Sequence, residues 1–71
     1  MEILEYDDMT IGGFIRSRRE QMKLSRNELS RRAYVSRTAL ENYESGVTTP
    51  SIQTLRKLLK TLGVDEVRIK T

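Results

Sequence analysis

Four polar side chains at helical spacing occupy the segment VSRTALENYESG, residues 35–46. On a helix of about 3.6 residues per turn, Leu40 and Tyr43 lie on one side with Ala39 beside them. The opposite side carries Arg37, Thr38, Glu41 and Asn42, followed by Ser45. Arg, Thr and Asn near the start of such a helix can form hydrogen bonds to the edges of DNA bases. The pattern alone fits either a solvated surface or a surface that reads DNA.

Composition excludes several classes of function. The chain has 71 residues, which indicates one domain, 1–71, and a core too small for a cofactor pocket. It contains no Cys and no His. Zinc sites, disulfides, thiol nucleophiles and imidazole bases are therefore excluded, and we expect no metal, no cofactor and no catalytic residue. The few carboxylates near the ends do not suggest an enzyme.

Neither a membrane span nor a secretory signal is expected. No apolar run approaches the roughly 20 residues that a spanning helix requires. The N-terminal segment MEILEYDD is acidic, whereas a signal peptide begins with a basic region. A cytoplasmic location is the default prediction.

Charge is distributed unevenly along the chain. The first ten residues contain four acidic residues and no basic one, although the net charge of the chain is +3. Between Arg16 and Arg37, eight basic residues accompany only Glu20 and Glu28. This local excess of positive charge indicates a polyanionic partner, with a solvated helical face as the alternative.

Local signals predict four helices. The first is expected over residues 11–22 with Thr10 as N-cap, although Gly12 and Gly13 each weaken its first turn by about 1 kcal/mol. Ser25 and Glu28 form the spacing of a capping box for a second helix that ends near residue 33.

Two further helices follow. Ser36 is expected to cap the third helix, and Gly46 follows its last turn. The fourth helix begins at Pro50 or Ser51 and ends at Gly63. Its expected apolar stripe consists of Ile52, Leu55, Leu58, Leu59 and Leu62.

The ends of the chain, residues 1–9 and 65–71, are less regular than the core, residues 10–64. EILEY and VDEVRIK have strand character, and their opposite charges would suit pairing within one chain or between two. An arm on DNA and frayed ends are the alternatives.

The pattern as a whole resembles the Xre/Cro/CI-type phage-repressor helix-turn-helix domains. The matching segments cover Ile11 to Val64 and are IGGFIRSRRE, LSRNELSRRA, VSRTALENYESG and TPSIQTLRKLLKTLGV. The resemblance implies an all-α, compact bundle of four to five helices, with any strands confined to the termini. It also implies an ion pair between Arg19 and Glu44 that joins the first helix to the third.

The resemblance assigns the third helix to the major groove of double-stranded DNA. Arg37 would then pair with guanine, Thr38 would contact a base or a thymine methyl group, and Asn42 would pair with adenine. Glu41 would either accept a hydrogen bond from cytosine or hold Arg37 in place. Backbone phosphate contacts would come from Arg26, Ser36, Thr48 and Thr49, although capping is the main role expected of Ser36.

Tyr34, Ser30 and Lys23 depart from the family pattern. Tyr34 stands in the turn where many members have Gly, so a left-handed backbone there would strain the chain by about 1 kcal/mol.

The expected function is sequence-specific DNA binding by a transcriptional regulator, most simply a repressor that binds a palindromic operator as a homodimer. One alternative is an antitoxin that represses its own operon and binds a toxin as protein partner. A protein-interaction module that has kept the fold but lost DNA binding is another.

Overall fold

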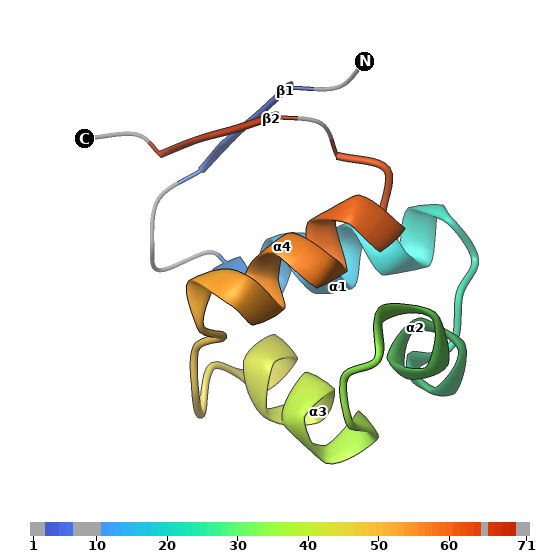
Figure 1. Ribbon diagram of the computed structural model, residues 1–71. Helices are drawn as coiled ribbons and strands as arrows, with labels where there is room; N and C mark the ends of the chain where they lie inside the picture. Colours follow the sequence, from blue (N-terminus) through green and yellow to red (C-terminus); the bar gives the residue numbers. More distant parts are fainter. Residues whose placement is uncertain (1–2, 7–10, 65, 70–71) are drawn as a thin grey trace.

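Four helices and two short strands make up the described part of the chain, which the computed structural model gives as residues 3–6, 11–64 and 66–69. The helices are α1 (Ile11–Gln21), α2 (Arg26–Ala33), α3 (Arg37–Ser45) and α4 (Ile52–Thr61). The strands are β1 (Ile3–Tyr6) and β2 (Glu66–Ile69), and Figure 1 shows them on the side of α1 and α4 away from α3. The predicted all-α, four-helix fold is confirmed. The N-cap proposed at residue 10 lies outside the described residues.

Hydrogen bonds at the helix ends follow the predicted caps. Ser25 accepts from the backbone N–H of Glu28, and the Glu28 carboxylate accepts from the backbone N–H of Ser25, which completes the capping box. Ser36 and Ser51 cap α3 and α4 in the same way through their hydroxyl groups. The sequence left the start of α4 open between Pro50 and Ser51. In the structure Ser51 is the N-cap and Ile52 is the first helical residue.

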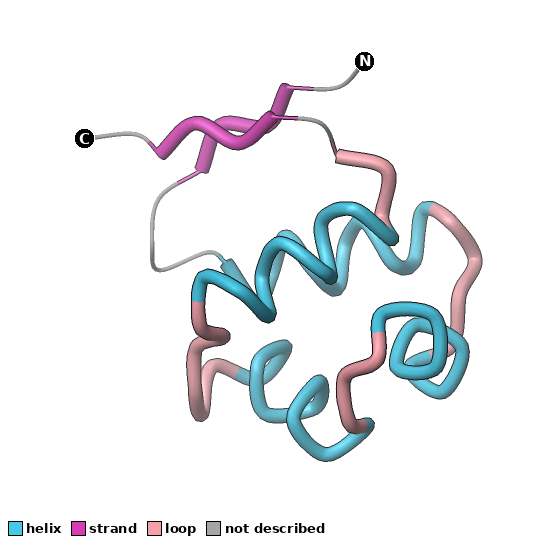
Figure 2. The backbone as a smooth tube through the Cα atoms, viewed as in Figure 1, coloured by secondary structure: helices cyan, strands magenta, loops and turns pink. Residues whose placement is uncertain are grey.

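The core lies where α2, α3 and α4 pack together and α1 covers α3. The side chains of Ile15, Leu29, Leu40, Leu58 and Leu62 are fully buried. The first four lie one on each of the four helices, and Leu62 is the C-cap residue of α4. The tube view in Figure 2 shows that short loops connect the four helices. Because Leu40 is fully buried, the position of α3 relative to the other helices is determined by packing.

One residue of the expected apolar stripe of α4 lies outside the core. Ile52 is 67 % exposed, whereas Leu58 is 0 % exposed. Ile52 is in the first turn of α4, beyond the region that the other helices cover. Periodicity identifies the face of a helix but does not say how far along the helix the contact extends.

The two strands pair in parallel. Ile3 is opposite Glu66, and the register continues to Tyr6 opposite Ile69. Of the alternatives for the termini, the structure therefore shows pairing within one chain. In the described residues the strands form a sheet of two, separate from the helical core in Figure 2.

Candidate nucleic-acid interface

The turn between α2 and α3 brings the two helices of a helix-turn-helix unit together. Tyr34 ends α2 in the left-handed conformation, with φ 56° and ψ 44°, and its side chain is 87 % exposed. Val35 follows with its side chain buried, and Ser36 caps α3. Tyr34 therefore has the left-handed backbone that the sequence raised as a condition, and it carries a strain of about 1–2 kcal/mol that Gly would not. Lys23, at the end of α1, has the same conformation, with φ 57°.

The exposed face of α3 carries the proposed base-reading side chains. Arg37, Thr38 and Glu41 are exposed, and Asn42, one turn further along, is half-buried. The helix begins at Arg37, so the first two of these residues stand at its N-terminal end. The structure therefore brings all four onto one helix, with Leu40 anchoring the opposite side.

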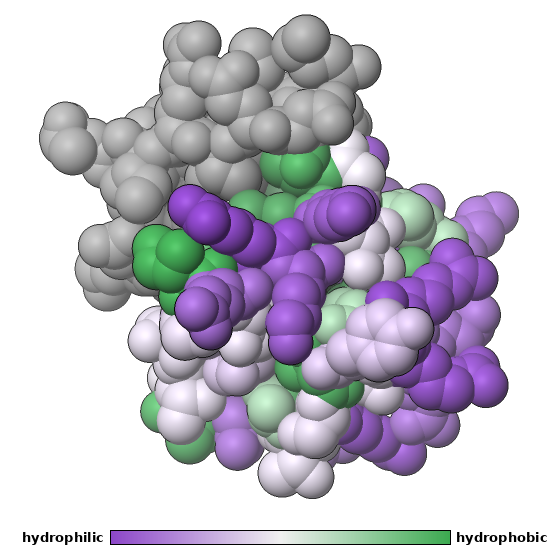
Figure 3. Space-filling model, viewed as in Figure 1, coloured by the Kyte–Doolittle hydropathy of each residue, from purple (hydrophilic) through white to green (hydrophobic). Residues whose placement is uncertain are grey.

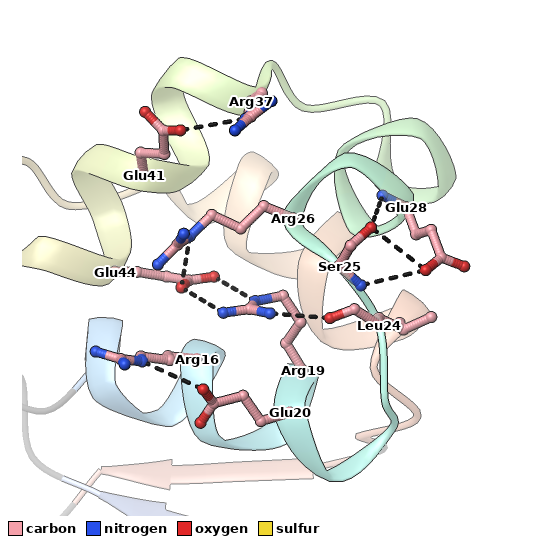
Figure 4. Close-up of polar contacts among 10 residues, drawn as sticks. All are labelled: Arg16, Arg19, Glu20, Leu24, Ser25, Arg26, Glu28, Arg37, Glu41 and Glu44. Atoms are coloured by element: carbon pink, nitrogen blue, oxygen red, sulfur yellow. Dashed lines mark hydrogen bonds and ion pairs between the residues drawn. The ribbon is translucent and has the colours of Figure 1, made fainter.

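Arg37 and Glu41 form an ion pair on that face. The Arg37 Nε donates to Glu41 Oε1 at 3.2 Å, and the two side chains are 58 % and 47 % exposed. Figure 4 shows the pair on the outer side of α3. Such an exposed i,i+4 pair adds little stability, about 0.3–0.5 kcal/mol at most. Its effect is to restrict where the guanidinium points.

A second set of contacts lies behind α3, at the junction of α1, α2 and α3. Arg19 donates from Nε to Glu44 Oε2 at 2.9 Å and from Nη2 to Glu44 Oε1 at 3.0 Å. Its Nη1 donates to the carbonyl of Leu24 at 2.9 Å. The hydrogen bond to Glu44 is the main reason that the pKa of Arg19 is raised above its ordinary value. The ion pair expected between helix one and helix three is thus present, buried and bidentate.

Arg26 reaches the same carboxylate, a contact that the sequence did not suggest. Its Nε donates to Glu44 Oε1 at 3.2 Å. The Glu44 side chain is 2 % exposed and the Arg26 side chain is 39 % exposed. In Figure 4, Arg26 approaches Glu44 from the start of α2, and Arg19 approaches it from α1. The sequence signal was absent because the two residues are 18 positions apart and lie on different helices.

The remaining phosphate candidates occupy the two loops that flank α3. Ser36 uses its hydroxyl oxygen to accept from the backbone N–H of Ala39. Thr48 and Thr49 are exposed in the loop between α3 and α4. The backbone N–H of Thr48 donates to the Asn42 carbonyl at 3.3 Å, so its hydroxyl is its remaining donor.

Several other basic side chains contact the protein itself. Arg18 donates from Nε to the carbonyl of Leu62 at 2.9 Å, where it satisfies the end of α4. Arg16 lies 3.5 Å from Glu20. The positive excess between Arg16 and Arg37 is therefore in part structural, which the sequence could not distinguish.

A cavity of about 450 Å³ lies between the C-terminal end of α2 and α4. Arg32, Lys57 and Lys60 line it, together with Tyr34. Figure 3 shows this side of the molecule, where hydrophilic side chains gather over α4. Positive side chains in the last turn of a helix offset its dipole, and this accounts for Arg32 and Lys60 without a ligand.

Metal-ligand clusters and membrane-spanning helices are both absent from the described residues. Across residues 3–6, 11–64 and 66–69, no three His, Cys, Asp or Glu side chains are grouped as metal ligands would be. Within the same ranges, none of the helices has the length and apolar character needed to cross a membrane.

These observations define a helix-turn-helix protein. A cap, a left-handed turn and a second cap hold α2 and α3 together, and α3 presents polar side chains outward. The family described as Helix-turn-helix (HTH_3) matches residues 15–69. The chain belongs to this family and is a DNA-binding transcription regulator of the Xre type, not an enzyme.

Comparison with solved structures supports the fold. The chain is similar to a crystal structure of a tyrosine-to-alanine mutant of the restriction-modification controller protein C.Esp1396I, with a TM-score of 0.76. The match covers 80 % of this chain and 74 % of that chain at 21 % sequence identity. A comparison with curated proteins gave no match.

Proposed function

We propose that the protein represses transcription by binding a palindromic operator as a homodimer, with α3 in the major groove. The observation that carries this proposal is the N-terminal end of α3, where Arg37 and Thr38 are exposed while Leu40 is fully buried in the core. In helix-turn-helix proteins the second helix enters the groove with its N-terminal residues toward the bases. The buried Leu40 packs this helix against the core, which sets its orientation relative to the other helices.

The side chains on this face match the donors and acceptors of base pairs. Arg37 donates to guanine O6 and N7, and Asn42 pairs with the N6 and N7 of adenine. Thr38 contacts a neighbouring base through its hydroxyl or its methyl group. Because Glu41 binds Arg37 Nε, it leaves the terminal nitrogens of Arg37 for guanine. We therefore assign Glu41 mainly to orienting Arg37, with cytosine N4 as its second partner.

Phosphate contacts come from the edges of the helix-turn-helix unit. Arg26 stands at the first residue of α2, where the helix dipole adds to its own charge in attracting an anion. The hydroxyls of Thr48 and Thr49 flank α3 on its other side. The Ser36 hydroxyl can donate to a phosphate while its oxygen caps α3. These contacts set the register of α3 on the duplex but carry no sequence information.

One α3 helix covers only half of a typical operator. Two copies about one helical turn of DNA apart would read a palindrome, which is why we propose a dimer. A dimer that covers a promoter excludes RNA polymerase, so repression is the simplest outcome. Since it acts on DNA, we place the protein in the cytoplasm.

The experiment that tests this function is selection of bound duplexes from a random DNA pool at near-physiological salt. A two-fold symmetric motif with a guanine and an adenine in each half-site would support the proposal. A short motif without symmetry would contradict the dimer and keep base reading by α3. No enrichment at all would overturn sequence-specific binding.

A further inference from the structure

We propose that Glu44 is a positioning residue for DNA binding, because it holds Arg26 so that the outer nitrogens of Arg26 face a backbone phosphate. This inference rests on the proposed function and deepens it. It gives the buried carboxylate a second role beside its ion pair with Arg19.

The charges at this junction do not balance within the protein. Arg19 already neutralises Glu44, with both carboxylate oxygens accepting hydrogen bonds from it at 2.9 and 3.0 Å. Arg26 adds a second positive charge to the same carboxylate. The three side chains together therefore carry one surplus positive charge. We assign the surplus charge to Arg26, because its side chain is 39 % exposed whereas that of Arg19 is 9 % exposed.

The geometry of the guanidinium leaves donors for a ligand. An Arg side chain has five N–H donors in a planar fork, and the Nε of Arg26 faces Glu44. Within the described part of the chain, no acceptor is recorded for the two terminal nitrogens of Arg26. One edge of the plane is thus fixed to the protein and the rest is open to solvent, a form suited to an anion with two acceptor oxygens.

A phosphodiester of DNA fits this arrangement in charge and in position. It carries a single negative charge, equal to the surplus at the junction. Arg26 begins α2, and Glu44 lies near the end of α3, so the fixed guanidinium spans the two helices of the DNA-binding unit. A phosphate bound by Arg26 would therefore connect the DNA backbone to the buried pair beneath α3.

Substitution of Arg26 by Lys tests charge and geometry separately, because Lys keeps the positive charge and lacks the planar guanidinium. Its ammonium group is a point charge without a second arm, so it can pair with Glu44 or with a phosphate but not hold both in one plane. If Glu44 positions Arg26, then Arg26→Lys should lose much of the affinity although the charge is kept. If charge alone matters, the same variant should bind as the wild type does.

The experiment measures affinity for a selected duplex at several salt concentrations, with the wild type, Arg26→Lys and Arg26→Gln. Arg31→Lys and Arg31→Gln are the matched controls, since Arg31 is an exposed arginine of the same helix. For Arg26→Gln, the slope of log K against log salt should fall by about 0.9, the value for one phosphate contact. Arg26→Lys should lose affinity about tenfold or more, as expected for a hydrogen bond between charged groups. Both Arg31 controls should leave the affinity within about twofold of the wild type.

A second readout locates the phosphate. Replacing single phosphates of the duplex by neutral methylphosphonates should weaken the wild type at one position in each half-site and leave Arg26→Gln unaffected there. Thermal unfolding without DNA shows which variants remain folded. A merely structural Arg26 would lower the unfolding temperature on substitution but leave the salt slope and the methylphosphonate pattern unchanged, and this result would overturn the proposal.

Different results overturn the positioning role of Glu44 and the proposed function. Wild-type affinity for Arg26→Lys would overturn the positioning role of Glu44 and leave DNA binding intact. An absence of DNA binding by the wild type would overturn the proposed function itself.

Discussion

At the scale of single residues, substitution of Arg37 tests whether this side chain reads a base or contacts the charged DNA backbone. We expect Arg37→Ala to cost about 1–3 kcal/mol at a site with guanine in one position, because a bidentate contact with O6 and N7 is lost. Sites with another base at that position should be affected much less. Affinities for four duplexes that differ only there measure the effect. An equal loss for all four duplexes would reassign Arg37 to a phosphate.

A second prediction concerns the contribution of Arg19 to the stability of the fold. The Arg19 side chain is 9 % exposed and that of Glu44 is 2 % exposed. Among the described residues, removing the guanidinium leaves Arg26 as the remaining ion-pair partner of this buried carboxylate. We expect Arg19→Met to lower the free energy of unfolding by about 3 kcal/mol. Urea denaturation measures it.

Arg16→Met provides the control for Arg19→Met. Arg16 is on the same helix, and its ion pair with Glu20 is exposed, with side chains that are 58 % and 57 % accessible. The change should be below about 1 kcal/mol. Equal effects of the two substitutions would contradict the structural role of the Arg19–Glu44 pair.

At the scale of elements, two adjacent glycines of α1 differ in what surrounds them. A Cβ on Gly12 would overlap the backbone carbonyl of Tyr43 in α3, whereas nothing lies within 4 Å of a Cβ on Gly13. We expect Gly12→Ala to destabilise the protein by about 1–3 kcal/mol, since the two backbones must separate. Gly13→Ala should instead stabilise it by about 0.5–1 kcal/mol through helix propensity.

Thermal unfolding of the two alanine variants tests this difference. If both are stabilised, α1 does not approach α3 as closely as described. The same contact explains a feature that the sequence left as a local weakness. Gly12 lowers the helix propensity of α1 but permits α1 to pack closely on α3.

Local hydrogen-bonding signals explain why the helices were predictable. Ser25 with Glu28, then Ser36, then Gly46 each act within one turn of the chain, and all three signals appear in the structure as predicted. The contacts that escaped prediction join distant parts of the chain. Arg26 with Glu44 is such a contact, and the parallel register of β1 with β2 is another, because the sequence suggested only that the two ends could pair.

The candidate site shows the same division. Spacing alone placed the four side chains of α3 on one face, because a helix determines which residues share a face. Their assignment to DNA bases came from the resemblance to the family. The sequence could not show which basic side chains remain available to DNA, because that depends on their partners in the folded protein. The Arg18 contact with the carbonyl of Leu62, 44 residues away, illustrates this dependence.

At the scale of the whole molecule, the helical core and the two-stranded sheet make unequal contributions to stability. Within residues 11–64, eight buried apolar side chains, from Ile15 to Val64, form one continuous cluster. The sheet consists of two parallel strands of four residues each. An isolated pair of strands is marginally stable in water, so it depends on the helical core more than the core depends on it.

We therefore expect a fragment of residues 10–64 to fold without the strands. Its unfolding should remain cooperative, with a free energy within about 2 kcal/mol of that of the full chain. Urea denaturation of both proteins, followed by circular dichroism, measures the difference. The slope with urea should fall only slightly, because it scales with the surface exposed on unfolding.

Sedimentation of both proteins then shows what the strands contribute to assembly: if only the full chain dimerises, the sheet belongs to the dimer interface. A fragment that does not fold would contradict a self-sufficient core and make the sheet an integral part of the domain.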